Sequence, residues 1–267
     1  MDKWIENIKD LFAQGEVTLV IGYEAGTDGD PRPFFCRSAQ QADRLVFPEG
    51  FAPNLAVYLT KQELVKGEKV AVIATVPTLR SICYLQGENQ LGSLSLAVYH
   101  LTQEGEWRQF ATPEQIAQYI DAIPLSLSEK DRALVEKLDA MTPEERWAFW
   151  QNEFSRCIKC YACRAVCPMC YCTRCIVEDN RPQWIDPWPS PLSNMEWQIS
   201  RVMHLAGRCV GCGSCGEACP EHIPVHLLNR RLSQDIQADF GVVPGAAPKQ
   251  GAVLNTFRVE DKENFIV

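Results

Sequence analysis

Cysteines dominate the chemistry that this sequence could perform. Eleven of the thirteen cysteines in the 267 residues fall between positions 157 and 219. Two segments in this window share the pattern C-x2-C-x2-C-x3-C-P and align without a gap. Three thiolates spaced in this way wrap a tight loop around one face of an iron-sulfur cubane, and the fourth faces away toward a second cubane. The first segment contains Cys157, Cys160, Cys163 and Cys167, and the second contains Cys209, Cys212, Cys215 and Cys219.

This pattern predicts two [4Fe-4S] clusters, each with one ligand from the other segment. The first cluster is expected on Cys157, Cys160, Cys163 and Cys219. The second cluster is expected on Cys209, Cys212, Cys215 and Cys167. Zinc bound to C-x2-C pairs would leave the third cysteine and the C-P ending of each segment unexplained, so the spacing favours iron-sulfur clusters.

A third group of thiols follows the first segment: Cys170, Cys172 and Cys175. Disulfides are rare inside cells, so three thiols within six residues indicate metal or redox chemistry there. They suit a third iron-sulfur cluster or a zinc ion. In another interpretation, one of them replaces Cys167 as a ligand and the others are packing or redox-labile thiols. The fourth ligand could come from a partner protein or from His204, His222, His226, Cys36 or Cys83. If Cys36 and Cys83 are not ligands, they are expected to be plain buried thiols.

Composition and charge limit the class of protein. Hydrophobic residues make up 46% of the chain, as in a folded globular protein. The N-terminus lacks the apolar core of a signal peptide, which predicts a cytoplasmic protein. No apolar run approaches the roughly 20 residues that span a bilayer, so no membrane span is expected. The net charge of −8 disfavours nucleic acid and anionic membranes as partners and favours a basic protein surface.

The first 111 residues are expected to form an α/β domain with a mostly parallel sheet, because helix-like and strand-like segments alternate. A turn-rich stretch at 26–33 predicts a surface loop. Predicted helices occupy residues 4–12, 54–59 and 79–85, and predicted strands occupy 17–22, 69–75 and 94–99.

The rest of the chain divides by composition. Helix-capping signals over 112–156 predict a helical connector. Residues 157–240 are expected to form an α+β ferredoxin-like dicluster domain with added helices, and 241–267 a C-terminal arm. Residues 181–191 include four prolines, which predicts an extended strap whose tryptophans lie against the metal domain.

The cysteine region, over 152–240, resembles bacterial-type two-cluster ferredoxins. Residues 207–215 and 219–224 look like the ferredoxin modules of heterodisulfide-reductase-type and quinone-linked complexes. The N-terminal part is similar to the coenzyme F420 hydrogenase/dehydrogenase beta-subunit family. That likeness rests on residues 17–24 (VTLVIGYE), 54–60 (NLAVYLT) and 69–90 (KVAVIATVPTLRSICYLQGENQ).

The turn after the strand ending at Thr75 departs from this family, which usually has Gly-Cys-Asp-x-Arg there. Residues 76–80 read Val-Pro-Thr-Leu-Arg, so only Arg80 remains, and it is either an anion contact or a surface salt bridge. A turn without its cysteine and acid cannot supply a ligand or a proton relay. The family's flavin and deazaflavin chemistry therefore does not transfer to this turn, and no catalytic residue is expected.

The resemblance implies an iron-sulfur electron-transfer subunit of an oxidoreductase complex. Such a subunit relays electrons between a redox enzyme subunit and a partner flavoprotein or heterodisulfide-reductase-like complex, with a formate dehydrogenase or a hydrogenase among the implied partners. One alternative is a flavin-dependent oxidoreductase subunit with flavin in the N-terminal domain. Another is a structural adaptor that holds zinc and iron-sulfur clusters.

Overall fold

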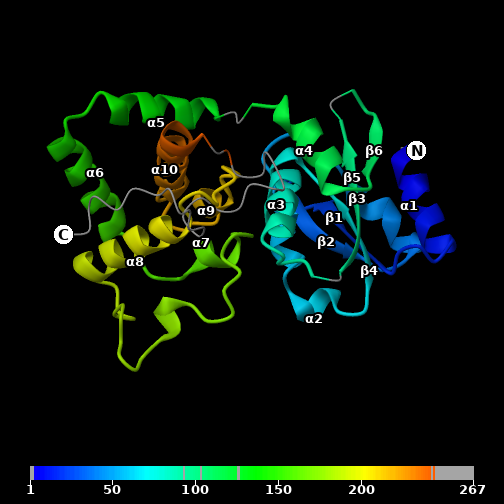
Figure 1. Cartoon of the computed structure of the whole chain (residues 1–267), viewed down its shortest axis with the longest axis horizontal. Helices are drawn as coiled ribbons and strands as arrows, with labels where there is room; N and C mark the ends of the chain where they lie inside the picture. Colours follow the sequence, from blue (N-terminus) through cyan, green and yellow to red (C-terminus); the bar gives the residue numbers. More distant parts are fainter. Residues whose placement is uncertain (1–2, 93, 103, 125–126, 242, 244–267) are drawn as a thin grey trace, which may run out of the picture.

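A mixed sheet forms the core of the N-terminal part of the chain (Figure 1). The structure is a computed structural model that describes residues 3–92, 94–102, 104–124, 127–241 and 243. The strands are β1 (Leu19–Ala25), β2 (Pro31–Cys36), β3 (Leu45–Val46), β4 (Lys69–Ile73), β5 (Ser95–Leu101) and β6 (Trp107–Phe110). The order is β2-β1-β4-β5-β6, with β1, β4 and β5 parallel, and β3 adds a short antiparallel pair to β1. The expected α/β class is confirmed.

The sequence predicts a loop throughout residues 26–33, and this prediction is wrong at its end. Strand β2 begins at Pro31 and pairs antiparallel with β1, from Ala25↔Pro31 to Val20↔Cys36. Proline cannot donate to a neighbouring strand, but the outer side of an edge strand needs no such donor. Because β2 lies at the edge of the sheet, its prolines are tolerated there.

Helices cover both faces of this sheet. Alternate residues of β1 enter two cores. Leu19 and Ile21 pack with helices α3 (Val76–Gly87) and α4 (Pro113–Asp121), whereas Val20 packs with helix α1 (Lys3–Ala13). The predicted helix at 54–59 is a single 3-10 turn, because the chain must turn again into α2. The helices of this part are α1 (Lys3–Ala13), η1 (Ala39–Arg44), η2 (Leu55–Tyr58), α2 (Gln62–Val65), α3 (Val76–Gly87) and α4 (Pro113–Asp121).

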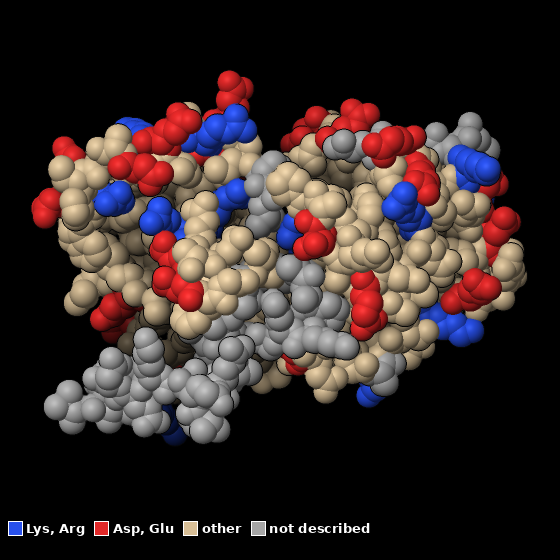
Figure 2. All heavy atoms as spheres, turned by 45° about the horizontal axis from the view of Figure 1, so that its top comes forward, with Lys and Arg blue, Asp and Glu red and all other residues tan. Residues whose placement is uncertain are grey.

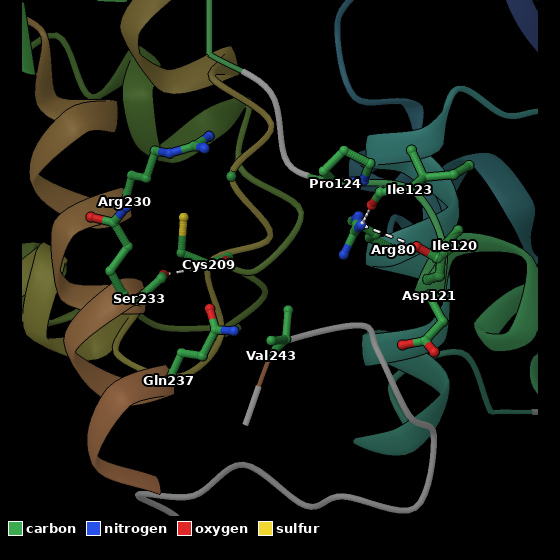
Figure 3. Close-up of a pocket in the computed structure, with 12 residues that line it drawn as sticks. Arg80, Ile120, Asp121, Ile123, Pro124, Cys209, Arg230, Ser233, Gln237 and Val243 are labelled. Carbon is green, nitrogen blue, oxygen red and sulfur yellow. Dashed lines mark hydrogen bonds between the residues drawn. The ribbon is translucent and has the colours of Figure 1, made fainter. Parts of the chain in front are cut away.

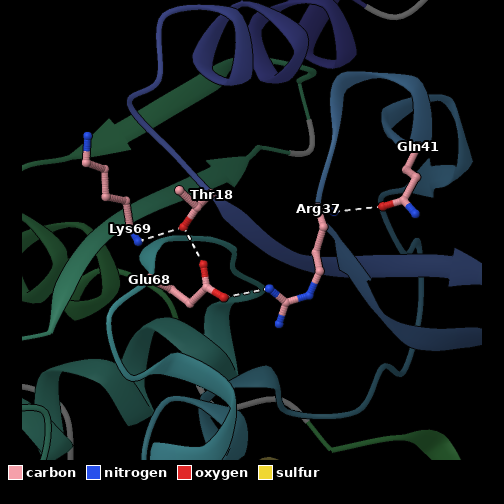
Figure 4. Close-up of polar contacts among 5 residues, drawn as sticks. All are labelled: Thr18, Arg37, Gln41, Glu68 and Lys69. Carbon is pink, nitrogen blue, oxygen red and sulfur yellow. Dashed lines mark hydrogen bonds and ion pairs between the residues drawn. The ribbon is translucent and has the colours of Figure 1, made fainter.

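A polar cluster ties the amino ends of two neighbouring parallel strands (Figure 4). The Thr18 hydroxyl, just before β1, accepts a hydrogen bond from the backbone N–H of Lys69 at 2.9 Å and donates to Glu68. Glu68 also accepts from Arg37 at 2.6 Å. These contacts tie β1 to β4 at this end of the sheet.

The cysteine-rich part is helical. Its core is formed by apolar residues of α5, α6, α8 and α10 together with several of the cysteines. In the described portion of residues 127–241, strand-like pairing is limited to the isolated bridge between Asn180 and Gln183. The helices are α5 (Glu129–Asp139), α6 (Pro143–Ser155), α7 (Ala162–Ala165), η3 (Ile176–Glu178), α8 (Pro191–His204), α9 (Ser214–Glu217) and α10 (Val225–Phe240).

The described part of residues 112–156 contains the helices α4, α5 and α6, but α4 and α6 belong to different cores. Helix α4 packs with the N-terminal sheet through Ile116 and Ile120, whereas α6 packs with the cysteine-rich core through Trp150 and Phe154. The predicted C-terminal arm lies outside the described residues except at its first positions. Over the described ranges, no helix combines the length and apolar character needed to cross a membrane.

The prediction that the tryptophans of the 181–191 strap lie against the metal domain is wrong. Trp184 and Trp188 are 62% and 75% exposed, respectively, whereas Ile185 between them is buried in the cysteine-rich core. The strap is also tied down by the Lys159 ammonium, which donates to the carbonyl of Asp186. An aliphatic residue and a backbone carbonyl therefore hold the strap, and the large indoles face outward.

Candidate metal centres

The two motif loops have the same backbone conformation. Lys159 and Tyr161 in the first loop have φ values of 55° and 57°, and Gly211 and Gly213 at the matching positions of the second have 70° and 76°. Each loop then enters a single helical turn, α7 or α9. Alternating right- and left-handed backbone points successive N–H groups into a concavity that binds anions. Two non-glycine residues in this conformation store strain, as is common where a site fixes the backbone.

The Cys163 sulfur of the first loop lies near two sulfurs of the second motif, those of Cys215 and Cys219. Cys163 is within electrostatic reach of Cys157 and of Cys219, which is the remote ligand predicted for this loop. Cys157 and Cys163 are buried, whereas Cys160 is exposed. This group therefore has one edge at the molecular surface.

The sulfurs of the second loop line a small cavity together with Cys167. The lining also includes Arg201, His226 and Asn229 from the adjoining helices, and its four thiols are Cys167, Cys209, Cys212 and Cys215. This is the predicted second quartet, and the structure brings all four residues to one cavity. In the described residues, no three His, Cys, Asp or Glu side chains converge as ligands of one metal ion do. Thiolates of a cubane bind different irons, so they are spread around the cluster rather than focused on one point.

Polar side chains from α8 and α10 approach the cysteine sulfurs. Gln198 Nε2 donates to Cys157 Sγ at 3.5 Å, and Asn229 Nδ2 lies 3.9 Å from Cys215 Sγ. Asn194, one turn before Gln198, donates to the carbonyl of Cys157 at 2.8 Å. Hydrogen bonds to cluster sulfurs are one of the main means by which a protein sets a cluster potential.

Buried polar atoms without partners concentrate around the quartets. In the described residues these atoms include Arg201 Nε and Nη1, Gln198 Oε1 and Asn229 Oδ1. Such atoms are costly in a protein interior unless a further group satisfies them. The cavity, the anion-binding loops and the two orphaned N–H donors of Arg201 together fit a bound cluster with anionic sulfur.

Sequence reasoning missed these polar residues. Asn194, Gln198 and Arg201 are spaced by four and three residues, so they lie on one face of α8, and each is at most 3% exposed. A polar stripe at helical spacing was the available signal. It could not be recognised as buried without knowing which face of α8 packs inward.

Burial makes the thiols of the quartets poor acids. It raises the pKa of Cys209 and of Cys215 to about 12, and that of Cys163 to about 11. For Cys215 and Cys163, the Arg201 cation opposes this rise. These thiols are therefore protonated at neutral pH in the metal-free chain, and iron must displace their protons to bind.

Comparison with known proteins is consistent with this arrangement. The family described as a 4Fe-4S dicluster domain matches residues 153–223. This segment is a dicluster domain. Its cysteine motifs imply two [4Fe-4S] clusters.

Two curated relatives are similar to the chain. The F420-dependent formate dehydrogenase subunit beta of Methanocaldococcus jannaschii is 30% identical over 133 residues, which is 49% of this chain and 33% of the relative. The F420-dependent formate dehydrogenase 1 subunit beta of Methanococcus maripaludis is 32% identical over 96 residues, which is 36% of this chain and 24% of the relative. The matched segments thus span a third or less of these relatives. Both parts of the resemblance inferred from the sequence are confirmed.

One member of the third cysteine group, Cys170, lies beside Cys167 of the second quartet. The Cys170 thiol is hydrogen-bonded to that of Cys167, which raises the pKa of Cys167 and lowers that of Cys170. Cys172 is exposed, and Cys175 begins the short helix η3.

The proposed fourth ligands do not join this group. Cys36 and Cys83 are buried in the two cores of the N-terminal part, as expected for plain thiols. His226 Nε2 contacts Asp131 on α5 at 2.9 Å, and its ring packs on Gly216, where a Cβ would clash with it. His204 and His222 are exposed.

The second quartet faces the N-terminal α/β part. The Asn54 side chain hydrogen-bonds Cys212 and opposes the rise in the pKa of this thiol that burial causes. The Asn54 backbone N–H donates to Ser214 Oγ at 3.3 Å. Met169 and Leu205 of the dicluster domain are buried in the core below α3. The N-terminal part thus contacts the second quartet, none of whose cysteines is exposed, whereas Cys160 of the first is exposed.

A cavity of about 350 Å³ separates the two parts beside this quartet (Figure 3). Cys209, Ser233 and Arg230 line its dicluster side, and Arg80 lines the other. Arg80 is only 4% exposed and donates to the carbonyls of Ile120 and Ile123 at the end of α4. The alternative of a surface salt bridge for Arg80 is therefore wrong, because this guanidinium is buried and caps a helix.

Proposed function

We propose that this chain is an iron-sulfur electron-transfer subunit that relays electrons between a redox enzyme subunit and a second partner, a flavoprotein or a heterodisulfide-reductase-like complex. The similarity to formate dehydrogenase beta subunits supports a formate dehydrogenase as one partner, and a hydrogenase is the other candidate. The observation that carries the proposal is the contrast between the quartets. Cys160 of the first is exposed, whereas none of the four cysteines of the second is exposed and Asn54 of the N-terminal part contacts Cys212. A relay needs one terminal open to a partner.

The ligand sets of this proposal follow the crossed pattern. We assign Cys219 to the first loop, because it neighbours Cys163, and Cys167 to the second loop, because it lines the cavity of Cys209 and Cys212. When bound, the cubanes supply reversible one-electron transfer. The chain itself holds the clusters close together, excludes water from the second and directs amide donors to the sulfurs.

A partner is expected at the edge where the first quartet meets solvent. Ile158 is 52% exposed beside Cys160, and the outward-facing Trp184 and Trp188 belong to the strap that Lys159 ties to this loop. Apolar and aromatic side chains of this kind are enriched in protein interfaces. Figure 2 shows Asp and Glu side chains on both parts of the molecule, and the net charge of −8 favours a partner with a basic surface.

A second candidate function is a flavin-dependent oxidoreductase subunit. The cavity of about 350 Å³ between the two parts favours it, because its size suits a small ligand and Cys209 lies at its wall. Arg80 and Arg230 would favour an anionic ligand there. Acid treatment of the purified protein separates the two candidates, since flavin is released only if it is bound.

Activity assays on the anaerobically purified chain test the main proposal. We expect absorption by the clusters and their reversible reduction, but no turnover with NADH, F420H2 or formate in the absence of partner subunits. Turnover by the pure single chain would contradict an electron-relay function. Restoration of electron flow by an added formate dehydrogenase or hydrogenase subunit would identify the donor.

Metal analysis tests the third cysteine group and the structural alternative. About eight irons per chain correspond to two clusters, about twelve to a third cluster, and eight irons with one zinc to a zinc site at Cys170, Cys172 and Cys175. The contact between Cys170 and Cys167 supports eight irons without zinc. Clusters that cannot be reduced would support a structural adaptor instead.

A further inference from the structure

A buried arginine without a carboxylate partner lies between the two quartets. Arg201 on α8 is 2% exposed, and its Nη2 donates to the carbonyl of Cys163 at 2.9 Å. Its Nε and Nη1 have no hydrogen-bond partner within the described residues. None of the ion pairs found in those residues includes Arg201. The protein thus encloses a permanent positive charge and leaves two of its nitrogen atoms unused.

The groups that face this guanidinium are sulfurs of both quartets. Cys215 and Cys167 of the second quartet and Cys163 of the first are its main electrostatic neighbours. Arg201 also lines the cavity of the second quartet, while its bond to the Cys163 carbonyl holds it against the first.

An uncompensated buried cation is strongly destabilising unless an anion lies beside it. The four thiolates of a cubane outweigh the positive charge of its core, so each cluster is anionic and becomes more so when it accepts an electron. A fixed positive charge therefore stabilises the reduced form of a cluster more than the oxidised form. The free N–H groups on Nε and Nη1 strengthen this effect because they can donate to sulfur.

We propose that Arg201 raises the reduction potentials of both clusters, with its guanidinium placed between them as a shared counter-cation and N–H donor to sulfur. This inference rests on the proposed function, because it requires a cluster in each quartet. It assigns Arg201 a role in setting the potentials of the relay in addition to bracing the Cys163 carbonyl.

The test is an EPR-monitored redox titration of the full chain and three variants. Arg201→Met removes the charge and keeps the length of the side chain, and Arg201→Lys keeps the charge. Arg231→Met is the matched control, because Arg231 is 63% exposed and ion-paired with Asp235 on α10. We expect Arg201→Met to weaken the electron affinity of each cluster about tenfold, which is ~59 mV for a one-electron couple. Arg201→Lys is expected to shift both potentials by less than half as much, and Arg231→Met by nothing measurable.

Unchanged potentials in an Arg201→Met protein with its full iron content would overturn the proposal. If this variant fails to bind iron, 15N ENDOR of the reduced wild-type protein, labelled with 15N-arginine, decides instead. We expect a nitrogen coupling that Arg201→Lys abolishes, and its absence in the wild type would overturn the proposal. A wild-type protein without two reducible clusters would instead refute the proposed function.

Discussion

The neighbouring thiols Cys167 and Cys170 give the sharpest test of the ligand assignment. Cys167 is an electrostatic neighbour of Cys209, Cys212 and Cys215, whereas the sulfurs that act most on Cys170 are those of Cys167, Cys163 and Cys175. Replacing Cys167 with alanine removes one of four ligands from the second cluster. We therefore expect the iron content to fall from about eight to about four per chain, with a matching loss of about half the visible absorbance.

Cys170→Ala removes a hydrogen bond to Cys167 and no ligand, so its iron content is expected to stay near eight. Iron analysis, visible absorption and EPR of both anaerobically purified variants measure these outcomes. Cys36→Ala is the control, since this buried thiol lies in the core beside α1 and is expected to leave the iron unchanged. Retention of eight irons by Cys167→Ala together with loss of half the iron by Cys170→Ala would show that the assignment is reversed.

Three further predictions concern buried polar side chains. Asn194→Ala leaves the buried carbonyl of Cys157 without its donor, whereas the carbonyl of Phe154 keeps the backbone N–H of Cys157 at 3.0 Å, so the free energy of unfolding should fall by roughly 1–3 kcal/mol in urea denaturation. Burial lowers the pKa of His100, which contacts Ala74 O and the Tyr119 hydroxyl and also lies near the Arg108 cation. The unfolded chain therefore binds a proton on His100 at a higher pH than the folded chain does, so the free energy of unfolding should fall as the pH drops below about 6.5. Denaturation of His100→Gln at several pH values should not show this fall. Asn229→Leu removes the amide near Cys215 Sγ and should lower the potential of the second cluster without loss of iron in the same redox titration, whereas an unchanged potential would exclude a direct contact with sulfur.

Local sequence signals predicted several elements of this fold correctly. Thr142 caps α6 with a reciprocal bond to Glu145, and Gly241 ends α10 in the left-handed conformation, as expected from capping signals and glycine at these positions. The parallel arrangement of β1, β4 and β5 followed from the alternation of strands and helices. Signals of this kind succeed because the interactions that they describe span only a few residues.

Other features required the tertiary structure. Whether Trp184 and Trp188 face inward depends on which residue of the strap meets the core, and that residue is Ile185. Pro31 can begin a strand only because β2 lies at an edge of the sheet. Strand order and side-chain burial are set by contacts between distant segments, which residue types alone do not specify.

In the dicluster domain, too, some features follow from local sequence and others from tertiary contacts. The sequence by itself determined the kind of cluster and its cysteines, because three ligands of each cubane come from one short loop whose spacing is visible in the chain. Only the tertiary structure placed Arg201 between the two quartets and Asn54 against Cys212. Arg201 lies 38 residues from Cys163, whose carbonyl it binds, and Asn54 lies 160 residues from Ser214. Thiolates identify the metal through local spacing, but the polar groups that tune it act through space, so their positions are decided by how the helices pack.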